Sequence, residues 1–142
     1  RLNYTAVGDT VNLASRLEGT NKTYKTWILI SDKTQIRIRE QILTRPVDKV
    51  AVKGKANAIL IHEVLCKKEN ETPELRKIID LTMLGFDHYL AMRFQQAIDC
   101  FKQILGVNKS DHLALFYIER CKGFLVFPPP SDWDGTYISH SK

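Results

Sequence analysis

The pattern of apolar residues changes at about residue 66, and this change limits the folds that the chain can adopt. Before it, short apolar runs alternate with polar turns, as in a domain that mixes strands and helices. The polar, proline-ended segment KKENETP comes next, at 67–73, and is typical of a linker and a helix start. Beyond it, apolar residues recur every three or four positions, as on a helix. The sequence therefore predicts an α+β chain that ends in a small all-α extension.

The first part contains signals for a strand, a short helix and a hairpin. Residues 27–30 predict a buried strand, and Ser31 opens a capping-box pattern for a helix. Pro46 is expected to interrupt the chain after that helix. The loosely alternating residues 47–53 and the apolar run 59–65 then predict two strands of a hairpin.

The second part predicts three helices. Their apolar faces comprise, in chain order, Leu75, Ile78, Ile79, Thr82, Phe86 and Tyr89; Ala97, Ile98, Phe101, Ile104 and Leu105; and Leu113, Phe116, Tyr117, Cys121 and Phe124. The order resembles one tetratricopeptide (TPR) repeat with a capping helix, although Tyr89 falls one position late and no second copy is visible. A single repeat cannot bury its apolar face by itself. We expect the extension to pack on a partner protomer or on the first part of the chain.

The end of the chain is rich in proline and has two interpretations. Pro128, Pro129 and Pro130 must be extended, and a turn at Trp133 comes after them. The segment is either a proline-rich ligand for another protein or a strap that lies back on its own helices. We favour the strap, with Trp133 as its apolar anchor.

The charge of the chain is uneven. The formal net charge is +5, and residues 1–65 carry 11 Lys and Arg against 6 Asp and Glu, whereas residues 66–142 carry 10 of each. A basic part of this kind suits a polyanionic ligand such as a nucleotide polyphosphate. Nucleic acid is disfavoured as a partner, because the basic residues do not cluster with aromatic ones and no nucleic-acid-binding motif is present.

Cysteine usage and hydropathy favour a cytoplasmic location. Cys66, Cys100 and Cys121 are an odd number of cysteines without metal-ligand or redox spacing, which is typical of structural thiols in a reducing compartment. No apolar run reaches the roughly 18 residues that span a bilayer. Because Arg1 is not an initiator, we expect the chain to be part of a longer protein, which can itself be attached to a membrane.

The segment YTAVGDTVNLASRLEG at residues 4–19 carries the most chemistry. Asn12 and Arg16 lie four positions apart just after a Gly-Asp turn, so one helical face presents an amide beside a guanidinium. A guanidinium can donate two hydrogen bonds to phosphoryl oxygens, and an amide can hold a neighbouring ribose. Asp9, at the start of the helix, is expected to cap its amides.

This segment, together with the VKGK run at 52–55, resembles the catalytic domain of class III nucleotidyl cyclases, in particular bacterial adenylate cyclases. The resemblance implies that residues 1–65 form the C-terminal half of such a domain, a partial ferredoxin-like βαββαβ unit. It implies an enzyme in which the ribose 3′-hydroxyl of ATP attacks the α-phosphorus, giving 3′,5′-cyclic AMP and pyrophosphate. A linker at 66–73, a TPR-like extension at 74–127 and a proline-rich tail at 128–142 complete the expected domain division.

The resemblance also implies roles for four residues. Asn12 would hold the ribose, and Arg16 would meet the charge that develops at phosphorus. Lys53 would contact the terminal phosphates, with Lys55 as a weaker candidate. Thr5 stands where the family recognises the base, and threonine can accept a hydrogen bond from the amino group of adenine, which favours ATP over GTP. A guanylate cyclase stays an alternative.

Two metal ions, Mg²⁺ or Mn²⁺, belong to the implied mechanism. Their two aspartates are expected upstream of residue 1, so no metal ligand is assigned within these 142 residues. In the family the active site lies between two protomers, so a homodimer is implied, and the 142 residues without their upstream part are expected to be inactive. An upstream sensor or membrane domain is a further expected partner. The competing interpretation is a non-catalytic cyclase-like module that dimerises or docks another signalling protein.

Overall fold

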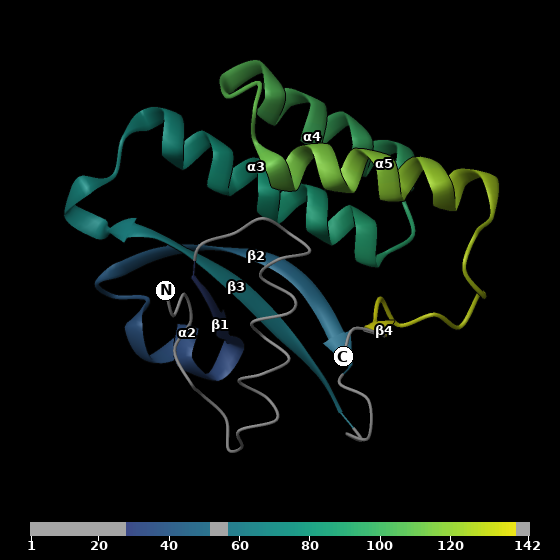
Figure 1. The fold of residues 1–142 in the computed structure, drawn as a ribbon, viewed down its shortest axis with the longest axis horizontal. Helices are drawn as coiled ribbons and strands as arrows, with labels where there is room; N and C mark the ends of the chain where they lie inside the picture. The colour runs from purple at the N-terminus through teal and green to yellow at the C-terminus, as the bar shows by residue number, and fades with distance from the viewer. Residues whose placement is uncertain (1–27, 52–56, 139–142) are drawn as a thin grey trace. The chain divides into compact units, whose positions relative to one another are not determined.

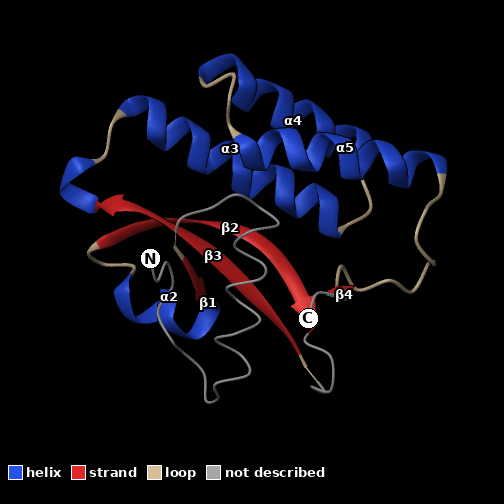
Figure 2. Cartoon of the chain, viewed as in Figure 1, coloured by secondary structure: helices blue, strands red, loops and turns tan. Residues whose placement is uncertain are grey.

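The computed structural model describes residues 28–51 and 57–138. The chain divides into two compact units, one formed by residues 1–71 with 136–142 and the other by residues 72–135. We call them the sheet unit and the helical unit and describe each separately (Figure 1). The α+β class predicted from the sequence is confirmed, with the strands in one unit and three long helices in the other (Figure 2).

The sheet unit contains a four-stranded sheet in the order β1-β3-β2-β4. β3 pairs antiparallel with both β1 and β2, and β4 pairs parallel with β2. The long β2–β3 pair confirms the predicted hairpin, whose turn lies outside the described residues. The elements of this unit are β1 (Leu29–Ser31), α2 (Asp32–Ile38), β2 (Ile42–Ala51), β3 (Ala58–Lys67), the 3₁₀ helix η1 (Lys68–Asn70) and β4 (Tyr137–Ile138).

The start of α2 agrees with its sequence signal. Ser31 has an extended backbone, and its side-chain oxygen accepts a hydrogen bond from the backbone N–H of Thr34 at 3.3 Å. This bond satisfies one of the amides that the first turn of a helix leaves without a partner. The short helix therefore begins where the capping residue predicted it.

The expected interruption at Pro46 is wrong, because β2 continues through this residue. Pro46 pairs with His62, and the next paired residue is Asp48, so Val47 is an extra residue on β2 at this point. Proline is tolerated in a strand beside such a bulge, where the ladder is already irregular. A second irregularity, between Leu43 and Thr44, cancels the shift, because there the extra residue lies on β3.

The helical unit contains the three predicted helices, α3 (Pro73–Leu90), α4 (Phe94–Val107) and α5 (His112–Val126). Thr72 caps α3 by accepting from the N–H of Leu75 at 3.1 Å, and Pro73 occupies the first turn, where its missing N–H costs nothing. Asp111 caps α5 by accepting from the N–H of Ala114 at 3.0 Å. The starts of these two helices are thus set by residues that satisfy free amides.

The core of the helical unit is aromatic. The rings of Phe101 and Tyr117 stack with centroids 5.0 Å apart, and the ring of Tyr89 meets that of Tyr117 edge-on at 4.9 Å. All three side chains are at most 1% exposed. Gly85 permits the close approach of α3 and α4, since a Cβ built there would lie 2.9 Å from Phe101 Cε2. The distance between α3 and α4 therefore depends on the lack of a Cβ at residue 85.

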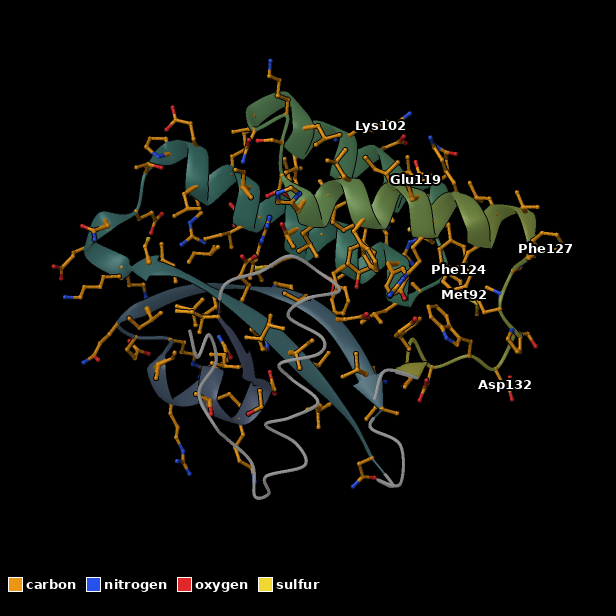
Figure 3. The ribbon with its side chains drawn as sticks, in the orientation of Figure 1. Met92, Lys102, Glu119, Phe124, Phe127 and Asp132 are labelled. Carbon is orange, nitrogen blue, oxygen red and sulfur yellow. The ribbon has the colours of Figure 1, made fainter. Side chains whose placement is uncertain are left out.

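The tail of the helical unit lies back on its helices, as the strap interpretation predicted. The ring of Trp133 lies 5.3 Å from that of Tyr89, 6.0 Å from that of Phe94 and 5.4 Å from that of Phe124. Gly135 has a φ of 90° and is buried, and a Cβ there would meet Leu90. These contacts fix the chain as far as residue 135. Phe127, at the end of α5, is 80% exposed and projects outward (Figure 3).

The domain division expected from sequence stays a prediction, as do the ferredoxin-like and TPR-like assignments. β3 runs to Lys67 and η1 comes directly after it, so regular structure extends into the expected linker at 66–73. The expected tail at 128–142 is shared between the two compact units. Within the described ranges, no helix combines the length and the apolar character that crossing a membrane requires.

Candidate functional site

The four residues assigned to the candidate site lie outside the described part of the chain. Thr5, Asn12 and Arg16 fall in residues 1–27, and Lys53 falls in residues 52–56. Their roles therefore stay predictions. What the structure describes is the hairpin on either side of Lys53, up to Ala51 on β2 and from Ala58 on β3.

The middle of this hairpin contains a buried ion pair that the sequence reasoning missed. Arg45 and Glu63 face each other in the β2–β3 ladder, and Arg45 Nε donates to Glu63 Oε1 at 3.0 Å. Their side chains are only 6% and 12% exposed. Buried charges are tolerated when they are paired and hydrogen-bonded, and removing one partner leaves the other uncompensated.

The ion pair lies in the short stretch between the two ladder irregularities. There Thr44, Arg45 and Pro46 pair with Val64, Glu63 and His62. On β2 the buried residues Leu43, Arg45 and Val47 alternate with half-buried ones, so Arg45 lies on the buried face of the strand. The charged residues inside otherwise apolar strands were the signal in the sequence, but the pattern did not show that they pair.

His62 joins β3 to the start of α2. Its Nε2 lies 2.8 Å from Asp32 Oδ1, and the His62 side chain is 11% exposed. Burial lowers the pKa of His62 below 6.5, and this effect exceeds the opposing influence of the Asp32 hydrogen bond and charge. The contact joins two elements of the sheet unit and is therefore structural.

Asp48 is a further buried carboxylate in the hairpin. The residue is 0% exposed, and its Oδ1 accepts a hydrogen bond from the backbone N–H of Lys49 at 2.8 Å. It lies directly after the bulged residue Val47. Side-chain acceptance of a neighbouring amide is a common way to satisfy backbone groups where a ladder is irregular.

The described residues do not form a metal site. Within residues 28–51 and 57–138, no group of three or more His, Cys, Asp or Glu side chains is placed to hold an ion. The cysteines are free thiols, and burial raises the pKa of Cys121 to about 12. A thiol with so high a pKa is inert at neutral pH, which agrees with a structural role. We therefore assign no metal ligand among these residues.

Comparison with known proteins shows what the chain is similar to. The chain is 36% identical over 125 residues to "Adenylate cyclase, terminal-differentiation specific" of Dictyostelium discoideum, across 85% of this chain and 6% of that protein. It is 46% identical over 65 residues to "Adenylate cyclase 1" of Rhizobium meliloti (strain 1021), across 46% of this chain and 10% of that protein. It is 45% identical over 67 residues to "Adenylate cyclase" of Anabaena cylindrica, across 45% of this chain and 13% of that protein.

The chain contains an adenylate-cyclase-like region. No family model matches the chain, and no solved structure matches it. The matched stretch of the chain spans only 6% to 13% of the length of these three relatives. Since the first alignment covers 85% of the chain, it cannot be confined to either compact unit. The similarity to the Dictyostelium protein therefore extends over parts of both units.

Proposed function

We propose that the chain is part of an adenylate cyclase that converts ATP to 3′,5′-cyclic AMP and pyrophosphate. The observation that carries the proposal is the 36% identity to an adenylate cyclase across 85% of the chain. The motif YTAVGDTVNLASRLEG supports it, because it supplies a guanidinium and an amide suited to a phosphate ester. In the proposed reaction the 3′-oxygen loses its proton and bonds to the α-phosphorus, and the bond from that phosphorus to pyrophosphate breaks.

Each proposed contact has a separate task. Arg16 donates to the oxygens that become more negative as the α-phosphorus is attacked, and Asn12 holds the ribose so that its 3′-oxygen points at phosphorus. Lys53 binds the terminal phosphates as a point charge. Thr5 accepts from the amino group of adenine, which guanine lacks at that position. The proposed substrate is therefore ATP rather than GTP.

The proposal includes a second protomer and residues outside these 142. Thr5, Asn12, Arg16 and Lys53 contact base, ribose and phosphate, whereas a complete site of the proposed kind also needs carboxylates for two Mg²⁺ or Mn²⁺ ions. We place those carboxylates outside this chain, and the proposed complete site between two protomers. On this proposal the 142-residue chain gives no cyclic AMP when it is assayed by itself.

The test is Arg16→Ala in the full-length native protein that carries this chain. Removing one donor from the developing charge should lower kcat on the order of 100-fold to 1,000-fold. Arg37→Ala is the matched control, because Arg37 is an exposed arginine of α2 and should leave kcat unchanged. Sedimentation should show the same oligomer for both variants. Full activity of Arg16→Ala would contradict the proposal, and unaltered cellular signalling by it would favour the non-catalytic scaffold.

A further inference from the structure

Three consecutive prolines come almost directly after α5, in an extended part of the helical unit. α5 ends at Val126, and residues 127–130, which we call the proline segment, lie outside every helix and strand. A proline fixes its own φ at about −65° and keeps the residue before it out of the helical region. Phe127, Pro128 and Pro129 each precede a proline. These restrictions favour the polyproline II conformation, an extended left-handed helix.

The proline segment is held at both ends within the helical unit. At its start, the backbone N–H of Phe127 donates to the carbonyl of Gly123 at 2.8 Å, which ties the segment to α5. At its end, the carbonyl of Pro130 accepts from the N–H of Trp133 at 2.9 Å, and the Trp133 ring packs against three aromatic rings of the same unit. A segment restrained in this way loses little conformational entropy when a partner binds it.

Most of the proline segment is nevertheless exposed. Phe127 is 80% exposed and projects away from α5, Pro128 and Pro130 are exposed, and Pro129 is half-buried (Figure 3). A polyproline II helix has about three residues per turn, so residues 127 and 130 share one edge and residue 128 lies on a second. Two of the three edges are thus accessible. Among the large apolar residues that the structure describes, none is more exposed than Phe127.

The backbone of the segment offers hydrogen-bond acceptors. Proline has no N–H, so its carbonyl is its one backbone polar group. Within residues 28–51 and 57–138, no backbone hydrogen bond uses the carbonyls of Pro128 and Pro129. A partner that packs on these prolines therefore needs side-chain donors to satisfy the two carbonyls.

The charges next to the proline segment also constrain the partner. Residues 123–131 carry no charge. Lys122, on the α5 side, lies with its Nζ 3.7 Å from Glu119 Oε2, so this charge is balanced locally. Asp132, on the other side, is exposed. A complementary surface is thus apolar along the segment and basic where it meets Asp132.

We propose that the proline segment is a docking site for a protein domain with an aromatic-lined groove that binds polyproline II helices. Grooves of this kind occur in SH3, WW and EVH1 domains. The Phe127 ring fills an apolar pocket of the groove, donors of the groove bind the carbonyls of Pro128 and Pro129, and a basic residue at its rim faces Asp132. The strap and the ligand, which the sequence offered as alternatives, then belong to one segment that Trp133 anchors. The inference does not depend on the proposed enzyme activity.

The test measures the affinity of the full-length native protein for three purified domains, one each of the SH3, WW and EVH1 classes, by calorimetric titration. At least one of them should bind, and Phe127→Ala should raise its Kd about tenfold or more, because a buried aromatic anchor dominates such an interface. Met83→Ala is the matched control, since Met83 is an apolar residue of α3 that is 51% exposed. It should leave the Kd within about twofold of the parent value.

Two further measurements locate the contact. A synthetic peptide of one phenylalanine followed by four prolines should displace the parent protein from the domain, and this competition needs no variant that folds. Asp132→Asn should weaken binding less than Phe127→Ala does, and its effect should vanish at high salt. Formation of cyclic AMP should be the same in Phe127→Ala and in the parent.

Three results would overturn the inference and leave the proposed function standing. The first is that none of the three domains binds, or that the peptide does not displace the one that does. The second is a Kd that Phe127→Ala leaves unchanged, or that Met83→Ala raises equally, because the contact would then not be specific to the proline segment. The third is self-association of the parent that Phe127→Ala abolishes, because the occupant would then be a second copy of the chain.

Discussion

At the scale of single residues, the stability of the sheet unit depends on the buried ion pair between Arg45 and Glu63. Glu63→Met removes the carboxylate that faces the buried Arg45 guanidinium, and we expect a loss on the order of 3 kcal/mol in the free energy of unfolding. The double variant Arg45→Met with Glu63→Met removes both charges and should recover most of that loss. Urea unfolding of the full-length protein measures both. A double variant that is as unstable as Glu63→Met would contradict this account.

His62 gives a second prediction, which concerns pH. Its pKa in the folded protein is lowered below 6.5 by burial, so the unfolded chain takes up the proton first as pH falls. The contribution of neutral His62 to stability is therefore fully present above about pH 6.5 and is lost as pH falls towards the lower folded pKa. His62→Gln, which keeps a group that can donate to Asp32, should lose less stability than the parent between pH 7.5 and pH 5. A steeper loss in the variant would contradict this account.

At the scale of elements, the contact between α3 and α4 depends on Gly85. Alanine favours a helix by up to about 1 kcal/mol over glycine, but a Cβ at residue 85 would lie 2.9 Å from Phe101 Cε2. We expect Gly85→Ala to destabilise the protein by about 1–3 kcal/mol, because overpacking outweighs helix propensity. Gly123→Ala is the matched control, since a Cβ there meets nothing within 4 Å and should stabilise α5 slightly. Thermal unfolding distinguishes the two, and a stabilised Gly85→Ala would contradict the packing argument.

The elements also show what the sequence can and cannot predict. Ser31, Thr72 and the apolar spacing after residue 73 act locally, so the starts of α2 and α3 and the three long helices could be predicted from the pattern. Trp133 was predicted as an anchor because a large apolar side chain after three prolines needs a surface on which to pack. Pro46 was misread, because its tolerance depends on a bulge that the partner strand creates. The ion pair and β4 depend on pairing between residues far apart in sequence, which local patterns do not contain.

At the scale of the whole molecule, the sheet unit is discontinuous in sequence. The helical unit is inserted between η1 and β4, so both of its ends connect to the same sheet. The candidate site was predicted from a motif at residues 4–19 and a lysine at 53, and its geometry lies outside the described residues. The support for function therefore comes from the similarity to adenylate cyclases, which extends over parts of both units, and from the chemistry of the motif.

The proposed cyclase activity is tested most directly by the products that the full-length native protein forms from ATP and from GTP. Cyclic AMP and pyrophosphate should appear in equal amounts from ATP. The formation of cyclic GMP from GTP should be at least tenfold slower, because the loss of one well-placed hydrogen bond costs on the order of a factor of ten. Arg16→Ala should abolish most of both activities. If the parent protein forms no more cyclic AMP from ATP than Arg16→Ala does, the chain does not supply the ATP contacts of an adenylate cyclase.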